Sequence, residues 1–280
     1  MLQVCVDGSG TGDPRALILA GYVASPATWL DFSKEWRSHL HDLKLPRFKM
    51  NEMVNREEIA ASFYRIIERH KVIAAISLTI STADLRKVVR EIVPPSDIEA
   101  ENLENPYYFA VKSIIGGLAA LQTEIGIAEP VDFIFDDESE KGQLLSIWPL
   151  MKAAMPPDVI KMIGGTPIFR DDEQFMPLQA ADLYAWWVRK WHLAGRGDRF
   201  SVSFPWSIKR KIDTLHMELT ESELRKSFTD AAKNISQRRW LQKQNEGTRM
   251  TLPDPSLEVR VNQGAFSARA AQAPKPRNSR

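Results

Sequence analysis

Residues 3–24, QVCVDGSGTGDPRALILAGYVA, hold the two apolar runs that decide the fold. Residues 3–6 have the composition of a short buried strand, which ends at the glycine-rich stretch 7–12. Leu17–Ala24 is a second apolar run without a helical period, so it predicts a strand that pairs with the first. A dinucleotide-binding turn needs a helix directly after its glycines, and a strand at 17–24 therefore argues against that interpretation.

Further strands and helices are expected to alternate along the rest of the chain. Apolar runs predict strands at 72–80, 131–135 and 160–169. Helical spacing of apolar residues predicts helices near 29–42, 56–70, 82–92, 105–125, 139–154, 176–194, 207–218 and 221–245. This order favours an α/β fold, a mixed five-stranded sheet flanked by helices, with parallel crossovers between the later strands.

Three regions are expected. Residues 1–195 would form the α/β domain, and residues 196–246 a C-terminal helical extension. Residues 247–280 are dominated by Pro, Gln, Ala, Ser and Arg without periodicity, which predicts a disordered basic tail.

The overall composition is that of a globular protein. The chain has 280 residues, of which 44% are hydrophobic and 26% charged, and this excludes wholesale disorder and fibrous repeats. Cys5 is the single cysteine, so it forms no internal disulfide, and a reducing, cytoplasmic location is expected. The longest apolar runs, such as 72–80, are far shorter than the ~20 residues that span a bilayer. No membrane association is therefore expected.

The net charge of +1 hides an uneven distribution. Residues 247–280 carry six Lys or Arg and two Asp or Glu, and residues 186–243 carry thirteen against six. Basic surface beside an acidic centre suits a polyanionic ligand that is approached through metal ions. The alternative is an ordinary solvated helical surface followed by a basic tail.

Four acidic residues fall where a catalytic centre would need them. Asp7 and Asp136 follow predicted strands, and ligands bind beyond the carboxyl ends of strands in open α/β sheets. Asp182 lies within a predicted helix on a face that is otherwise apolar, where a carboxylate is costly unless it is paired or bound to a cation. Glu52 lies in the linker before the helix at 56–70, from which it can reach the same place.

Three or four such carboxylates suit Mg²⁺ or Mn²⁺, because hard divalent cations prefer oxygen ligands. Two ions held close together activate a water and stabilise the leaving oxygen of a phosphodiester. Each residue also has a plainer interpretation. Aspartates at strand ends often form turns or helix caps. Asp182 can instead pair with a buried arginine such as Arg189, and Glu52 can be a surface residue.

Three short motifs resemble the domain of unknown function 3800 family. They are residues 4–10, VCVDGSG, residues 133–137, FIFDD, and residues 178–185, LQAADLYA. That family typically opens with an apolar strand into Asp-Glu-Ser-Gly and closes with a Gln-Leu-Ala-Asp-Leu helix. Residues 48–52, FKMNE, are similar to its central Phe-His-Ala segment, which an acidic position follows. The resemblance covers about residues 1–195.

The resemblance implies a ribonuclease H-like fold and a metal-dependent nuclease, of a kind found in bacteria and their mobile elements. By position, Asp7, Asp136 and Asp182 take the places of metal ligands for Mg²⁺ or Mn²⁺, and Glu52 that of a fourth. The implied partner is a nucleic acid, either DNA or RNA. The chain departs from the family at Gly8, which replaces the usual Glu, and at Lys49, which replaces a frequent His.

Two other functions stay open on the sequence alone. The departures at Gly8 and Lys49 favour a catalytically inactive nucleic-acid-binding or scaffold protein with the same fold. The Asp-Gly-Ser-Gly-Thr turn also resembles the first phosphate loop of actin-like ATPases and sugar kinases. Those proteins need two copies of the core, for which 280 residues with a disordered tail are few.

Overall fold

The computed structural model of the chain describes residues 1–9, 15–92, 105–137, 141–153, 155–194, 206 and 209–229. The expected tail at 247–280, and the part of the expected last helix beyond residue 229, lie outside the described residues.

A mixed six-stranded sheet forms the centre of the described fold, with the strand order β5-β4-β1-β2-β3-β6. The first three strands pair antiparallel in a meander, and they are β1 (Leu2–Ser9), β2 (Leu17–Ala24) and β3 (Ala74–Ile80). The other three pair parallel to their neighbours, and they are β4 (Val131–Asp136), β5 (Ile168–Arg170) and β6 (Asp213–Leu219). The α/β class and the pairing of the first two strands are as predicted.

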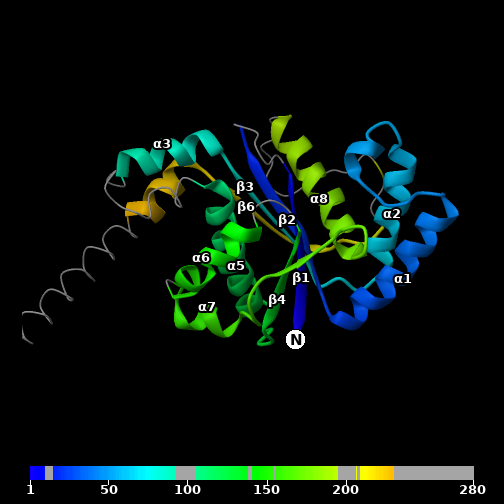
Figure 1. Cartoon of the computed structure of the whole chain (residues 1–280), viewed down its shortest axis with the longest axis horizontal. Coiled ribbons are helices and arrows are strands. Elements are labelled where there is room, and N and C mark those ends of the chain that lie inside the picture. The colour runs from blue at the N-terminus through cyan, green and yellow to red at the C-terminus, as the bar shows by residue number, and fades with distance from the viewer. Residues whose placement is uncertain are drawn as a thin grey trace, which may run out of the picture. The chain divides into compact units, whose positions relative to one another are not determined.

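Helices cover both faces of this sheet (Figure 1). One face is packed by α3 (Thr82–Ile92), α5 (Pro106–Glu124), α6 (Lys141–Ala153) and α7 (Pro157–Lys161). The opposite face is packed by α1 (Pro26–Asp42), η1 (Met50–Met53), α2 (Glu57–Arg69) and α8 (Met176–Leu193). In the part of the chain that the structure describes, no helix combines the length and apolarity needed to cross a bilayer.

Successive side chains of β1 point to opposite faces, and this alternation decides where Asp7 lies. Val4 and Val6 pack among the helices α3, α5 and α6, whereas Cys5 packs on the side of α8. The strand period of two therefore directs Asp7 to the α8 side. The strand continues to Ser9, so Asp7 lies inside β1, not just after it as expected.

The region expected to be a helix at 207–218 contains β6 instead. Leu215, Met217 and Leu219 pack toward the core on one face of the sheet, and His216 hydrogen-bonds to Ser77 on the other. This alternation has the period of two that is typical of a strand. Over a short stretch with exposed charges, that pattern resembles the amphipathic pattern of a helix. The strand pairs with β3, so the sheet has six strands where five were expected, and its sixth strand comes from the region expected to be a helical extension.

The strand expected at 160–169 is also largely wrong. Its first residues belong to α7, and β5 contains only Ile168–Arg170. Gly164 and Gly165 precede Pro167, which has no backbone donor, and such residues weaken or interrupt a ladder. The short strand nevertheless pairs in parallel with β4, which places the residues after Arg170 beside the end of β4.

The close approach of β1 and β2 requires a glycine at position 21. A Cβ atom on Gly21 would lie 1.8 Å from the backbone oxygen of Cys5. We expect Gly21→Ala to lower the free energy of unfolding by about 3 kcal/mol, because two paired strands must separate to make room. Gly116→Ala in α5 is the matched control, since its Cβ meets nothing within 4 Å. Urea denaturation should show the control unchanged or slightly stabilised, and equal effects would contradict this account.

Candidate functional site

Asp7 and Asp136 lie side by side on two parallel strands, just beyond the last residues by which these strands pair. The last paired residues of β1 and β4 are Val6 and Phe135, so the two aspartates occupy the next position on each strand. Adjacent strands are separated by only ~4.8 Å, and both side chains point to the α8 face. Asp7 is buried, with a side-chain oxygen that accepts a hydrogen bond from the Gly8 amide at 2.7 Å.

Asp182 reaches the same place from α8. One of its oxygens accepts a hydrogen bond from the backbone amide of Met50 at 2.6 Å. One helical turn earlier, the side-chain oxygen of Gln179 accepts hydrogen bonds from the backbone amide of Phe48 at 3.0 Å and from the indole of Trp36 at 2.8 Å. The helix α8 thus holds the segment 48–50 by two backbone amides, one on each side of Lys49.

A fourth carboxylate in the cluster is Asp172, which our reading of the sequence missed. It follows β5 by two residues and is 6% exposed. Gln179 also donates a hydrogen bond to its backbone oxygen at 2.8 Å. The signal was available, because Asp171 and Asp172 follow an expected strand just as Asp136 and Asp137 do. We call Asp7, Asp136, Asp172 and Asp182 the carboxylate cluster.

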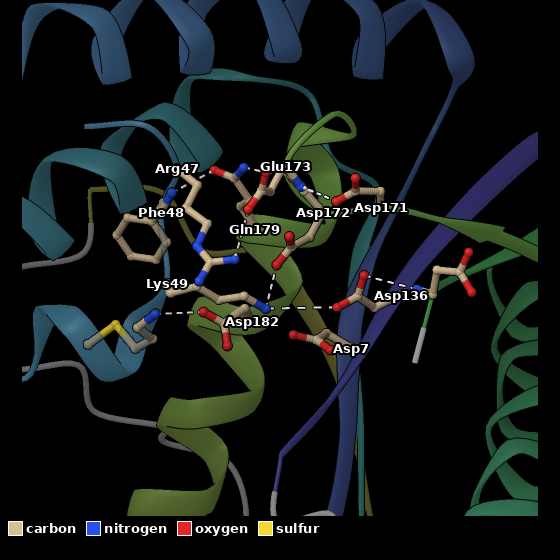
Figure 2. A network of polar contacts seen from close by, with 12 residues as sticks. Asp7, Arg47, Phe48, Lys49, Asp136, Asp171, Asp172, Glu173, Gln179 and Asp182 are labelled. Atoms are coloured by element: carbon tan, nitrogen blue, oxygen red, sulfur yellow. Dashed lines mark hydrogen bonds and ion pairs between the residues drawn. The ribbon is translucent and has the colours of Figure 1, made fainter. Parts of the chain in front are cut away.

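The ammonium group of Lys49 lies among these carboxylates (Figure 2). Its Nζ atom forms an ion pair with Asp172 and lies 3.8 Å from Asp136 Oδ2. Asp182 and Asp7 are near enough for their charges to act on it. Burial alone lowers the pKa of Lys49, but its contact with Asp172 and the charges of Asp182 and Asp7 outweigh that effect. The pKa is raised well above its ordinary value, so Lys49 is a cation at neutral pH.

The carboxylates themselves are held in an unfavourable environment for charge. Desolvation, together with the charges of Asp172 and Asp136, raises the pKa of Asp182 to about 6, against the opposing effects of the Met50 amide and Lys49. Desolvation and the charge of Asp172 also raise the pKa of Asp136 above its usual value. Four carboxylates therefore share one ammonium group, and the cluster keeps an excess of negative charge.

An open pocket of about 350 Å³ leads to the cluster. Every residue along its wall is charged, and these residues are Arg47, Lys49, Asp136, Asp137, Asp171 and Asp172. Four carboxylates against two basic groups make the pocket acidic. A phosphate group would be repelled from it unless additional cations entered as well.

Glu52 is not brought into the cluster. The turn η1 places Met50 and Met53 in the core and leaves Glu52 exposed, where its Oε1 atom lies 3.6 Å from Arg47 Nη2. Three of the four residues chosen from the sequence therefore come together with Asp172, and Glu52 lies outside.

The donor set of the cluster fits Mg²⁺ or Mn²⁺ in chemistry and in charge, because it consists of carboxylate oxygens with uncompensated negative charge. The carboxylate side chains of the cluster are not arranged as in a metal centre. Among the residues that the structure describes, no group of three or more His, Cys, Asp or Glu side chains is placed to hold a metal ion. The side chain of Lys49 lies where the carboxylates would have to approach one another.

Comparisons of the chain with protein-family models, with curated proteins and with solved structures give no match. Its own fold and site define an α/β protein with an acidic cluster between two parallel strands and the helix α8.

Proposed function

We propose that this protein is a Mg²⁺- or Mn²⁺-dependent nuclease that hydrolyses phosphodiester bonds, with a ribonuclease H-like core related to the domain of unknown function 3800 family. The single observation that carries the proposal is the convergence of carboxylates from distant parts of the chain. Asp7, Asp136 and Asp182 come from two strands and a helix, and they meet around one point with Asp172.

Each member of the cluster would have a defined task. Asp7 and Asp136 stand on neighbouring strands and would hold cations from the sheet side, while Asp182 and Asp172 would hold them from the α8 side. When bound, such ions supply an activated water and neutralise charge on the leaving oxygen of a phosphodiester. The rigid sheet and α8 would keep the carboxylates in place, which is what a site of this kind requires.

A nucleic acid is the proposed substrate because its phosphodiester backbone is a polyanion. Lys209, Arg210 and Lys211 are exposed and would add basic surface just before β6, at the end of the sheet away from the cluster, where they would contact a more distant part of the nucleic-acid backbone. The backbone amides of Lys209 and Arg210 donate hydrogen bonds to Glu68 at 2.6 and 3.1 Å, which ties this short segment to α2. Basic side chains held on a fixed backbone are suited to contact phosphates without reading sequence.

A second candidate function is favoured by Lys49. An ammonium group that is permanently paired with the cluster would leave no need for a metal ion. The protein would then be a catalytically inactive nucleic-acid-binding or scaffold protein with the same fold. The two candidates differ in one measurable property, the binding of divalent cations.

The test is a panel of labelled single-stranded, double-stranded and hybrid nucleic acids incubated with Mg²⁺ or Mn²⁺. We expect cleavage of at least one substrate, and Asp7→Asn should reduce it by more than about a hundredfold, since changes even beside metal ligands cost 10–100-fold. Glu52→Gln, which alters a carboxylate outside the cluster, should keep its activity. Absence of cleavage together with absence of Mn²⁺ binding would favour the inactive candidate.

A further inference from the structure

We propose that the ammonium group of Lys49 is a built-in competitor of the metal ions, so that a divalent cation binds the carboxylate cluster only by displacing it. This inference rests on the proposed metal-dependent function and adds a means by which the site is controlled. It explains how four carboxylates can stay together in the metal-free protein.

The positive charge of Lys49 lies where a metal ion would have to bind. Lys49 Nζ pairs with Asp172, lies 3.8 Å from Asp136, and is surrounded in Figure 2 by the carboxylates of Asp7 and Asp182. Its side chain is only 21% exposed, unlike that of an ordinary surface lysine. A cation at this point neutralises part of the charge that a divalent ion would otherwise neutralise.

The backbone around Lys49 directs its side chain to this place. Lys49 is in an extended conformation, so its side chain points opposite to those of its neighbours. Phe48 and Met50 are both buried in the core, and their amides are held by Gln179 and Asp182. The side chain of Lys49 consequently has one direction open to it, into the carboxylate cluster.

The other basic residue of the pocket wall does not pair with the cluster. Arg47 is engaged elsewhere, with its Nη1 atom 3.1 Å from Glu173 Oε1 and its Nη2 atom 3.6 Å from Glu52 Oε1. Its charge is thus already shared with two carboxylates at the rim. Lys49 is the basic residue of the pocket wall that pairs with the cluster itself.

Displacement is physically reasonable for a lysine. Its charge is carried on a flexible four-carbon chain, and an ammonium group is strongly hydrated, so it can move into the open pocket without a change in the backbone. A divalent ion offers twice the charge to the same oxygens. The affinity of the site for metal would then be reduced by the free energy needed to remove Lys49 from the carboxylates.

The test is to measure Mn²⁺ binding by titration calorimetry to the full chain and to Lys49→Met. We expect Mn²⁺ to bind Lys49→Met at least about tenfold more tightly than it binds the wild type. This is a modest part of the repulsion between a unit positive charge and a divalent ion a few Å away. Without metal, the same variant should melt about 5 °C lower, because the carboxylates lose their partner. Saturating Mn²⁺ should raise its melting temperature more than that of the wild type.

Two control variants separate competition from other effects. Lys141→Met also removes a positive charge beside the pocket, but Lys141 Nζ pairs with Asp137 at 2.8 Å, outside the cluster, so Mn²⁺ affinity should change less than about twofold. Lys49→Arg keeps the charge and should bind Mn²⁺ no more tightly than the wild type. If Lys49→Met does not fold, Lys49→Gln replaces it in the same titration.

The proposal is overturned if Lys49→Met binds Mn²⁺ no more tightly than the wild type, or if Lys141→Met shows the same gain. It is also overturned if neither neutral variant of Lys49 folds in the presence of Mn²⁺. Tighter binding without cleavage of any nucleic acid would sustain the competition and reject the nuclease. Cleavage by a wild type that binds Mn²⁺ as tightly as Lys49→Met would support the nuclease and reject the competition.

Discussion

Replacing Asp182 with asparagine is expected to abolish metal-dependent cleavage while leaving the metal-free protein at least as stable as the wild type at pH 7. Asparagine keeps the shape and an oxygen that accepts the hydrogen bond from the Met50 amide. It removes a charge that desolvation and the neighbouring carboxylates disfavour. The loss of activity should exceed about a hundredfold, because Asp182 is a proposed direct ligand.

The stability effect of Asp182 depends on pH in a defined direction. Its carboxyl group ionises near pH ~3.9 in the unfolded chain and near pH 6 in the folded one. Between these values the folded state binds a proton that the unfolded state has lost, so stability falls as the pH rises through this window. Asp182→Asn lacks this dependence. Its stability relative to the wild type should therefore increase by about 2 kcal/mol from pH 4 to pH 7.

The matched variant is Asp182→Ala, which removes the charge together with the hydrogen-bond acceptor. It should be less stable than Asp182→Asn by about 1–3 kcal/mol, since the Met50 amide is left without its partner. Thermal unfolding of both variants at the two pH values is the measurement. A strongly destabilised Asp182→Asn protein that still binds Mn²⁺ would end the proposed role of Asp182 as a ligand.

Gln179→Leu is expected to lower the free energy of unfolding by about 4 kcal/mol, the largest stability effect that we expect. Gln179 is fully buried, and its amide serves three groups, namely the Trp36 indole, the Phe48 amide and the Asp172 carbonyl. Leucine has a similar volume but satisfies none of them, and each unsatisfied buried group costs about 1–3 kcal/mol. Because the segment 48–50 and the residues after β5 both depend on Gln179, Mn²⁺ binding should weaken as well.

Gln122→Leu in α5 provides the comparison for this variant. Gln122 is also buried, at 2% exposure, but its side chain donates to the Glu129 carbonyl at 2.7 Å, on the side of the sheet away from the cluster. We expect a cost of about 1 kcal/mol and unchanged Mn²⁺ affinity. Chemical denaturation measures the free energy of unfolding of both variants. Equal losses would show that the hydrogen bonds of Gln179 contribute no more to stability than the one made by Gln122.

The central part of the fold could be predicted because its signals are local. The strands β1, β2, β3 and β4 each contain a short apolar run, and the helices α5 and α8 have prolines at their first turns and apolar residues at helical spacing. The edges of the sheet could not be predicted in the same way. An edge strand such as β6 is half exposed, and its pattern over seven residues does not distinguish a strand from an amphipathic helix.

The candidate site also contains residues that local sequence signals predicted and residues that they did not. Asp7, Asp136 and Asp182 were predicted to converge from strand ends and from an unpaired charge on an apolar helix face, and these are properties of single segments. The sequence places Glu52 and Lys49 three residues apart in one linker, with nothing to say which would turn inward. Asp172 was overlooked although it follows the strand expected at 160–169, much as Asp136 follows the one expected at 131–135.

By itself, then, the sequence determined the α/β class, the pairing of the first two strands and three carboxylates that a cation could share, because short-range periodicity and the chemistry of single residues are sufficient for these. Only the tertiary structure decided that Lys49 enters the cluster and Glu52 stays outside. The reason is physical: Gln179 and Asp182 on α8 hold the amides of residues more than a hundred positions away in the chain, and no local pattern encodes a contact between such distant segments.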